Sequence, residues 1–176
     1  WSSDVCSSDL DEIPAALVDD MRELGLFGMC IPEEYGGLGL TMEEEVRVTF
    51  ELAWASPAFR SLIGTNNGIG SQGIIIDGTA AQKEKYLPRL ASGELIASFA
   101  LTEPDSGSDA AALRTRAVRE GEGYILNGTK QYITNAPEAG IFTVMARTDP
   151  SIKGAAGISA FLVEAGTPGL ALGKRD

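Results

Sequence analysis

The spacing of apolar residues changes about halfway along the chain. Before residue 95, apolar residues recur every three or four positions, which is the period of a helix that buries one face. After it, short apolar runs alternate with polar residues or are bounded by turn residues, which favours β-strands. The pattern therefore predicts helices first and strands second.

Two helices are indicated before residue 56. The first lies within residues 11–24 and ends before Gly25, a residue suited to a helix C-terminal cap. The second covers residues 42–55, and Thr41 and Glu44 have the spacing of a capping box at its start. One side of the second helix is predicted to carry Val46, Thr49, Phe50 and Ala53. Trp54 is expected in the core.

The helical pattern continues to about residue 93. Pro57 either stops the preceding helix or opens the next one. Residues 58–76 predict a helix that breaks near Asn66 and Asn67. Thr79 and Gln82 form a second capping-box pattern, so a further helix is expected to begin at residue 80.

The second half contains strand candidates with no helix between them. A Gly-Glu-Gly turn at residues 121–123 precedes one of them, and Asn127–Gly128 is a hairpin signal because both residue types tolerate positive φ. The candidates are short and bounded by turn residues: 95–101, 114–120, 123–126, 131–134, 141–148 and 157–164.

Helices followed by strands predict an α+β fold, with an N-terminal all-α domain followed by an antiparallel β-barrel or sandwich domain. The expected domains are residues 11–95 and 96–176, which meet near residues 93–96. No GxGxxG turn follows a predicted strand, which argues against a doubly wound nicotinamide-binding fold.

The two ends of the chain look unlike natural termini. Residues 1–10 (WSSDVCSSDL) lack Met, repeat SSD and resemble translated sequencing-adapter sequence, so they are expected to be a non-native artefact. A natural N-terminal tail is the alternative. Since no terminating signal precedes Asp176, the chain is expected to be truncated at both ends.

Composition excludes several functional classes. The net charge of −11 without a basic stripe argues against nucleic acid and against anionic membrane surfaces. There is no histidine, so a Ser-His-Asp or Cys-His mechanism is excluded within this chain, and a zinc site is not expected. Two cysteines make no disulfide framework, and no apolar run is long enough to predict a membrane span.

The segment with the clearest chemistry is ALTEPDSGSDAAA, residues 100–112. It ends a predicted strand with Thr102 and Glu103, and Pro104 then interrupts the ladder of hydrogen bonds. Residues 106–108 (Ser-Gly-Ser) predict a tight turn whose N–H groups and hydroxyls can face an anion. A loop that satisfies only its own Ser and Asp side chains is the alternative, and the chemistry by itself favours that interpretation.

This segment resembles the signature of the acyl-CoA dehydrogenase family. Its fixed positions are filled by Ala100, Leu101, Thr102, Glu103, Ser106, Gly107, Ser108, Asp109 and Ala112. Residues 127–135 (NGTKQYITN) resemble the NGxKxWITN motif of that family, with Tyr132 in place of the usual Trp, and residues 35–39 (YGGLG) resemble its early loop. The resemblance covers residues 11–176 and implies a helical domain, a β domain and then a helical bundle.

The resemblance implies an FAD site between the β domain and the bundle. The residues it assigns to the cofactor are Phe99, Ala100, Leu101, Thr102, Gly107, Ser108, Tyr132, Ile133 and Thr134. Thr102 and Thr134 would hydrogen-bond the flavin ring, and residues 132–134 would cover one face of it. Ser108 would lie near the phosphates of the ligand and is also the expected substrate contact. Donors at the ring stabilise the charge that develops on reduction.

The implied reaction is α,β-dehydrogenation of an acyl-CoA thioester, with hydride transfer to flavin N5 and electrons passing to an electron-transfer flavoprotein. The family's base is a Glu or Asp of the later bundle, so no catalytic residue is predicted here and this chain alone is expected to be inactive. The resemblance also implies a homo-oligomer, a dimer or tetramer. A bacterial-type cytoplasmic location is expected in preference to the mitochondrial matrix.

Two alternatives remain open at this point. An acyl-CoA oxidase or a flavin monooxygenase of the same fold would share these motifs. A non-enzymatic β-barrel interaction module, in which the glycine turns are only structural, is the more remote one.

Overall fold

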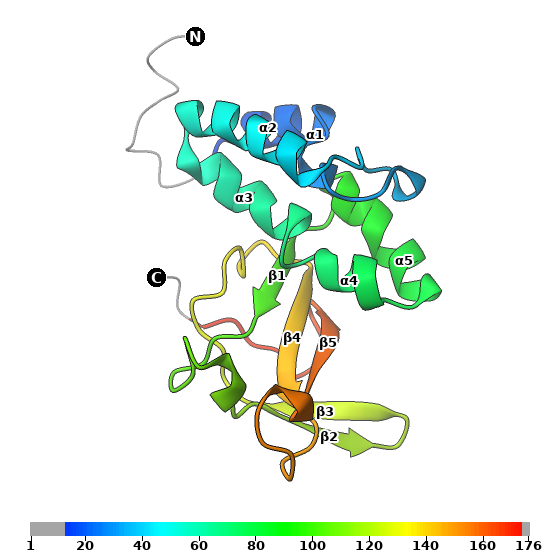
Figure 1. The fold of residues 1–176 in the computed structure, drawn as a ribbon, viewed down its shortest axis with the longest axis vertical. Helices are drawn as coiled ribbons and strands as arrows, with labels where there is room; N and C mark the ends of the chain where they lie inside the picture. The colour runs from blue at the N-terminus through cyan, green and yellow to red at the C-terminus, as the bar shows by residue number, and fades with distance from the viewer. Residues whose placement is uncertain (1–12, 174–176) are drawn as a thin grey trace. The chain divides into compact units, whose positions relative to one another are not determined.

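A computed structural model describes residues 13–173 of the chain (Figure 1). The chain divides into two compact units, Trp1–Ile96 and Ala97–Asp176. The first unit is helical and the second is built on a sheet. The α+β class, helices first, is therefore confirmed. The segment 1–10, expected to be an artefact, lies outside the described residues.

Two helices of the helical unit begin at the capping boxes that the sequence predicts. The α-helices of this unit are α1 (Ala15–Glu23), α2 (Met42–Ala55), α3 (Pro57–Asn67), α4 (Gln72–Asp77) and α5 (Ala80–Ala91) (Figure 1). At α2 the Thr41 hydroxyl accepts from the Glu44 N–H, while the Glu44 carboxylate accepts from the Thr41 N–H at 2.8 Å. Thr79 and Gln82 repeat this reciprocal box at α5. Both predicted capping boxes are confirmed.

The predicted break near Asn66 and Asn67 is also confirmed, because α3 ends at Asn67. Asn66 Nδ2 donates to the carbonyl oxygens of Leu90 at 2.9 Å and Leu95 at 2.8 Å. Asn67 Nδ2 donates to the carbonyl of Leu26 at 2.6 Å. Both amides are buried. They donate to buried backbone carbonyls, of which Leu90 also accepts the Gly93 N–H at 3.2 Å.

The core of the helical unit packs against the side of α2 that carries Val48 and Leu52. Phe27 is fully buried in the cluster that forms this core, and Val48 and Leu52 of α2 pack against the cluster. Trp54 is 85% exposed, so the expectation that it lies in the core is wrong. Val46 and Phe50 are exposed as well. α2 carries two apolar stripes, and periodicity alone does not tell which of them is buried.

The second unit is one five-stranded mixed sheet. Its strands are β1 (Ala97–Ala100), β2 (Arg116–Glu120), β3 (Gly123–Asn127), β4 (Ile141–Arg147) and β5 (Ile158–Glu164) (Figure 1). β5 pairs antiparallel with the whole of β4, and β2 pairs antiparallel with β3. On its other edge β4 pairs in parallel with β1, from Ala97↔Ile141 to Ala100↔Val144, and then with β2 at Arg116↔Arg147.

The prediction of a purely antiparallel domain is therefore wrong. After β1 the chain forms the β2–β3 hairpin. It then returns as β4, which runs beside β1 and in the same direction. A parallel pair requires a long crossover connection, and residues 101–140 provide one.

Two local predictions in this unit are also wrong. The β2–β3 hairpin turns at residues 121–122, where Gly121 has φ +60°, and Asn127 is simply the last residue of β3. Gly128 has another role, since a Cβ there would collide with the Thr115 side chain. Residues 131–134 are not a strand, because Tyr132 adopts φ +57° and the backbone turns there.

Candidate functional site

The candidate site is formed by two loops of the sheet unit, residues 101–109 and 128–135, which the motifs single out. The first leaves β1 at Ala100 and closes into a tight turn. In this turn Glu103 and Ser106 exchange both backbone hydrogen bonds, at 2.9 and 3.1 Å. The Ser106 hydroxyl donates to the carbonyl of Asp109 at 2.8 Å. The N–H, carbonyl and hydroxyl groups of Ser106 are therefore all hydrogen-bonded within the turn, whereas Gly107 and Ser108 are exposed at its tip.

The two loops are joined by hydrogen bonds across a long sequence separation. The Gln131 N–H donates to the carbonyl of Thr102 at 3.0 Å. The fully buried Ser98 hydroxyl donates to the carbonyl of Thr134 at 2.7 Å. The structure therefore brings Thr102 and Thr134, two residues predicted for one site, onto segments that are bonded to each other.

Glu103 lies beneath these loops as a buried carboxylate that is 6% exposed. Its Oε2 accepts the Arg114 N–H at 2.6 Å, and its Oε1 accepts the Thr115 N–H at 2.9 Å. Oε1 also accepts from Lys130 Nζ at 2.8 Å. Burial alone would raise the pKa of Glu103, but the hydrogen bonds from Lys130, Thr115 and Arg114 outweigh it and lower the pKa to about 2. A carboxylate held in this state is a poor proton acceptor, in agreement with the absence of a predicted base role.

The remaining predicted residues range from exposed to buried. Tyr132 is 75% exposed, and Thr134 is exposed beside it. Ile133 packs against the buried cluster that contains Ala100, Phe142 and Val144. The other three, Phe99, Leu101 and Thr102, are half-buried.

This set of donors fits a flavin chemically. It offers an exposed aromatic ring at Tyr132, hydroxyls at Thr102 and Thr134, and an open turn at residues 107–108. A Cβ on Gly107 would meet nothing within 4 Å, so the turn is open on its outer side. Among residues 13–173 no group of three His, Cys, Asp or Glu side chains is arranged to hold a metal ion.

Lys130 belongs to this site although it was not among the residues predicted from the motifs. Besides Glu103, its Nζ donates to the carbonyl of Leu101 at 2.9 Å, and its side chain is 11% exposed. The signal that could have found it is its place in NGTK, directly before the segment assigned to the flavin ring, combined with the acidic residue of the other motif.

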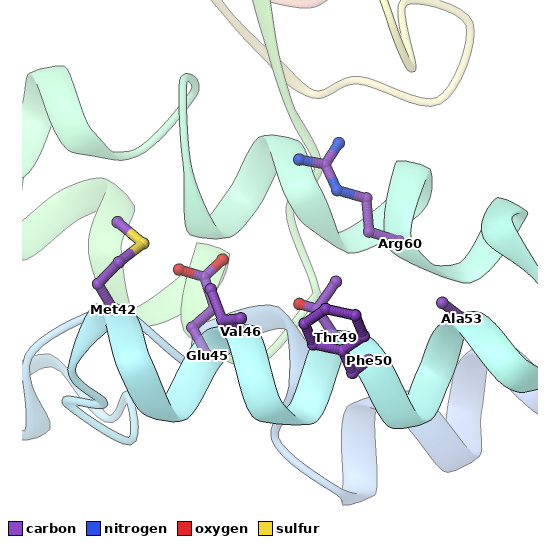
Figure 2. A pocket seen from close by; sticks show the side chains of 7 residues that line it. All are labelled: Met42, Glu45, Val46, Thr49, Phe50, Ala53 and Arg60. Atoms are coloured by element: carbon purple, nitrogen blue, oxygen red, sulfur yellow. The ribbon is translucent and has the colours of Figure 1, made fainter.

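A second feature, in the helical unit, is an open groove of about 300 Å³. Figure 2 shows Met42, Val46 and Phe50 along one side of α2, with Arg60 on α3 across from them. Glu45 also lines the groove, and its carboxylate accepts a hydrogen bond from the Cys30 thiol at 2.9 Å. Burial, then the hydrogen bond and charge of Glu45, raise the pKa of Cys30 to about 12. This thiol is therefore not a ready nucleophile.

Two family models match most of the chain. The acyl-CoA dehydrogenase N-terminal domain matches residues 6–94, and the acyl-CoA dehydrogenase middle domain matches residues 98–176. No helix in the part of the chain that the structure describes is long and apolar enough to cross a membrane.

The chain is also similar in sequence and structure to individual known proteins. An acyl-CoA dehydrogenase of Bacillus subtilis is 42% identical over 166 residues, which are 94% of this chain and 44% of that protein. The butyryl-CoA dehydrogenase structure from Megasphaera elsdenii has a TM-score of 0.85 at 38% identity, covering 93% of this chain and 43% of that one. The prolyl acyl carrier protein oxidase AnaB has a TM-score of 0.89 at 35% identity, covering 99% of this chain and 46% of that one. The chain thus spans less than half the length of each.

Proposed function

Because the chain belongs to the acyl-CoA dehydrogenase family, we propose that it is the helical and flavin-binding part of an enzyme that oxidises an acyl-CoA thioester between Cα and Cβ. The domains of this part are residues 11–95 and 96–176. The cofactor is FAD, held by residues 99–102, 107–108 and 132–134. When bound, it supplies the acceptor for the hydride that leaves Cβ.

The observation that carries the proposal is the bonded pair of loops. The Gln131–Thr102 and Ser98–Thr134 bonds hold two motif segments together while Tyr132 and Thr134 stay exposed. This arrangement leaves an aromatic face and two hydroxyls available to one planar ligand. Thr102 and Thr134 would donate to the ring, and Tyr132 would exclude water from one face of it. The turn at Gly107 and Ser108 would meet the phosphates of the ligand.

No residue of the chain is assigned as the base. Glu103 is tied to three donors, and its pKa of about 2 disfavours proton uptake. We assign the base to a Glu or Asp in the portion of the relatives' length that this chain does not span. We also expect electrons to pass to an electron-transfer flavoprotein, the enzyme to be a homodimer or homotetramer, and its location to be the cytoplasm.

An acyl thioester oxidase of the same fold is the second candidate. The likeness to AnaB, a prolyl acyl carrier protein oxidase, favours it. The two reactions share proton and hydride removal and differ in what accepts the electrons.

One experiment separates the candidates. The full-length protein that contains this chain is mixed with a series of acyl-CoA thioesters, first without oxygen and then in air. We expect flavin absorbance near 450 nm to bleach without oxygen, and turnover in air to require an added electron acceptor. Rapid peroxide formation in air would instead identify the oxidase. Absence of bleaching with every thioester would overturn the proposed reaction.

A further inference from the structure

The buried pair of Glu103 and Lys130 lies at the junction of three backbone segments of the sheet unit. Glu103 accepts from the Arg114 and Thr115 amides, which precede β2. Lys130 donates to Glu103 and also to the carbonyl of Leu101, the residue before Thr102. Four directional hydrogen bonds therefore converge on two side chains that are almost fully buried.

The neighbours of this pair are the residues proposed to meet the flavin ring. Thr102 lies between Leu101 and Glu103. Lys130 donates a hydrogen bond to each of these two neighbours, to the carbonyl of Leu101 and to the carboxylate of Glu103. On the other loop, Lys130 is followed by Gln131, which bonds Thr102, and then by the exposed Tyr132. Tyr132 has φ +57°, a conformation that a bulky residue adopts only when its surroundings hold it, whereas the φ of +61° at Asn135 is one that asparagine tolerates.

We infer that Glu103 and Lys130 form a positioning pair for the cofactor: they fix Thr102 and residues 132–134 in the geometry that the flavin ring requires. This inference rests on the proposed flavin site. Neither residue touches the ring or moves a proton. Their contribution is to hold, before the ligand arrives, donors that lie on loops 27 or more residues apart in sequence.

A purely stabilising role makes a different prediction. A buried ion pair adds little net stability compared with apolar side chains of similar volume, because desolvation offsets the attraction between its charges. What apolar side chains cannot supply is the set of bonds to the Arg114 and Thr115 amides and to the Leu101 carbonyl, which sets the register of three segments. Loss of the pair should therefore affect the ligand site beyond any general loss of stability.

The test uses the full-length protein in its FAD-bound form and the variant Glu103→Gln. The glutamine keeps the size of the side chain, but its NH2 group would face a donor, so at least one bond is lost. We expect the dissociation constant for FAD to rise roughly 10- to 100-fold, and the visible flavin band and the flavin reduction potential to shift. Lys130→Gln should act in the same direction. Lys130→Arg, which keeps a charged donor, should recover part of the affinity.

Two controls separate positioning from folding. Asp105→Asn makes the same chemical change in the same loop, on a carboxylate that forms an exposed pair with Arg114 at 3.0 Å, and should leave FAD affinity unchanged. Asn66→Ala removes buried hydrogen bonds in the helical unit and should lower the melting temperature without the shift of the flavin band. Glu103→Gln with a lowered melting temperature but unchanged affinity and spectrum would overturn the inference. If Glu103→Gln does not fold, Lys130→Gln is judged by the same criteria.

A measurement without flavin keeps this inference separate from the proposed function. Amide hydrogen exchange at Arg114, Thr115 and Gln131 should be faster in Glu103→Gln than in the wild type, and unchanged in Asp105→Asn. If the wild type holds no FAD, the proposed function fails together with the ligand role of the pair. If the wild type binds FAD while exchange at these amides is the same in Glu103→Gln, the pair does not position the loops and the inference fails alone.

Discussion

The helix starts of the helical unit and the motif loops of the sheet unit are held by contacts of different sequence separation. In the helical unit, both capping boxes join residues three apart, so each helix start is encoded within one turn. In the sheet unit, Lys130 meets Glu103 across 27 residues, and Ser98 meets Thr134 across 36. The motif loops therefore reach their geometry only when distant parts of the chain come together. A site built in this way depends on its long-range bonds more than on local preference.

The largest expected effect concerns what lies outside this chain. We expect the 176-residue chain alone to be inactive and to bind FAD weakly, because no base is assigned and one side of the flavin site would face water. Exposed apolar area costs roughly 25 cal/mol for each Å², so a few hundred Å² weakens binding by several kcal/mol. The assay follows bleaching of an artificial electron acceptor with acyl-CoA and FAD. Turnover at about a hundredth of the rate of a full-length relative would place a base within this chain.

The next effect tests the long-range pair directly. Lys130→Met leaves the Glu103 carboxylate buried without its cation, which should lower the free energy of unfolding of the sheet unit by roughly 3 kcal/mol. The control is Arg47→Met, which breaks the exposed Arg47–Glu43 pair of α2 and should cost less than about 0.5 kcal/mol. Hydrogen exchange with mass spectrometry reports the two units separately. If Lys130→Met and Arg47→Met lower the free energy of unfolding equally, the long-range pair contributes no more than the exposed pair of α2, and the proposed difference between the units is wrong.

Acid should act on the same pair, with a smaller effect because a protonated Glu103 can still accept hydrogen bonds. Its pKa is lowered from 4.5 to about 2 in the folded protein. Its contribution to stability is therefore complete above pH 4.5 and is lost as the pH falls through 2. Unfolding of the sheet unit between pH 5 and pH 2 should be less pH-dependent in Glu103→Gln. An identical slope in both proteins would show that another group dominates.

The helical unit also has long-range hydrogen bonds, among them those of Asn66. Asn66→Ala leaves the buried carbonyls of Leu90 and Leu95 without this donor and should cost about 2 kcal/mol. Chemical denaturation of the variant, followed by far-ultraviolet circular dichroism, measures this cost. A value under about 0.5 kcal/mol would mean that water replaces the amide.

The smallest effect is expected for a local contact. Thr41→Ala removes the hydroxyl that caps α2 and should cost about 1 kcal/mol. Thr41→Ser keeps the cap and should restore most of the loss. The midpoint of denaturation is sufficient to compare the three proteins. A cost as large as that of Lys130→Met would argue that local and long-range contacts hold the chain equally.

The difference in sequence separation between contacting residues also explains which parts of the fold could be predicted. The starts of α2 and α5 and the end of α3 follow from neighbouring residues, and they were predicted. Pairing of β1 with β4 depends on where residues 101–140 run, and no local pattern reports this. Trp54 was misplaced because its stripe and the stripe of Val48 and Leu52 are both apolar, and only tertiary packing decides between them.

The same holds for the candidate site. The motif residues could be named from the sequence because their types and spacing resemble those of a family. The strand predicted for residues 131–134 failed because tertiary bonds hold Tyr132 in a left-handed conformation that its β-propensity does not favour. Lys130 was missed because its partner is 27 residues away.

The paired loops of the sheet unit are proposed to hold FAD. The most direct test is to purify the full-length protein, denature it and identify the released cofactor by chromatography. We predict FAD, close to one per chain, and a much smaller yield from Glu103→Gln than from Asp105→Asn. Release of FMN, of a nicotinamide or of no cofactor would contradict the claim.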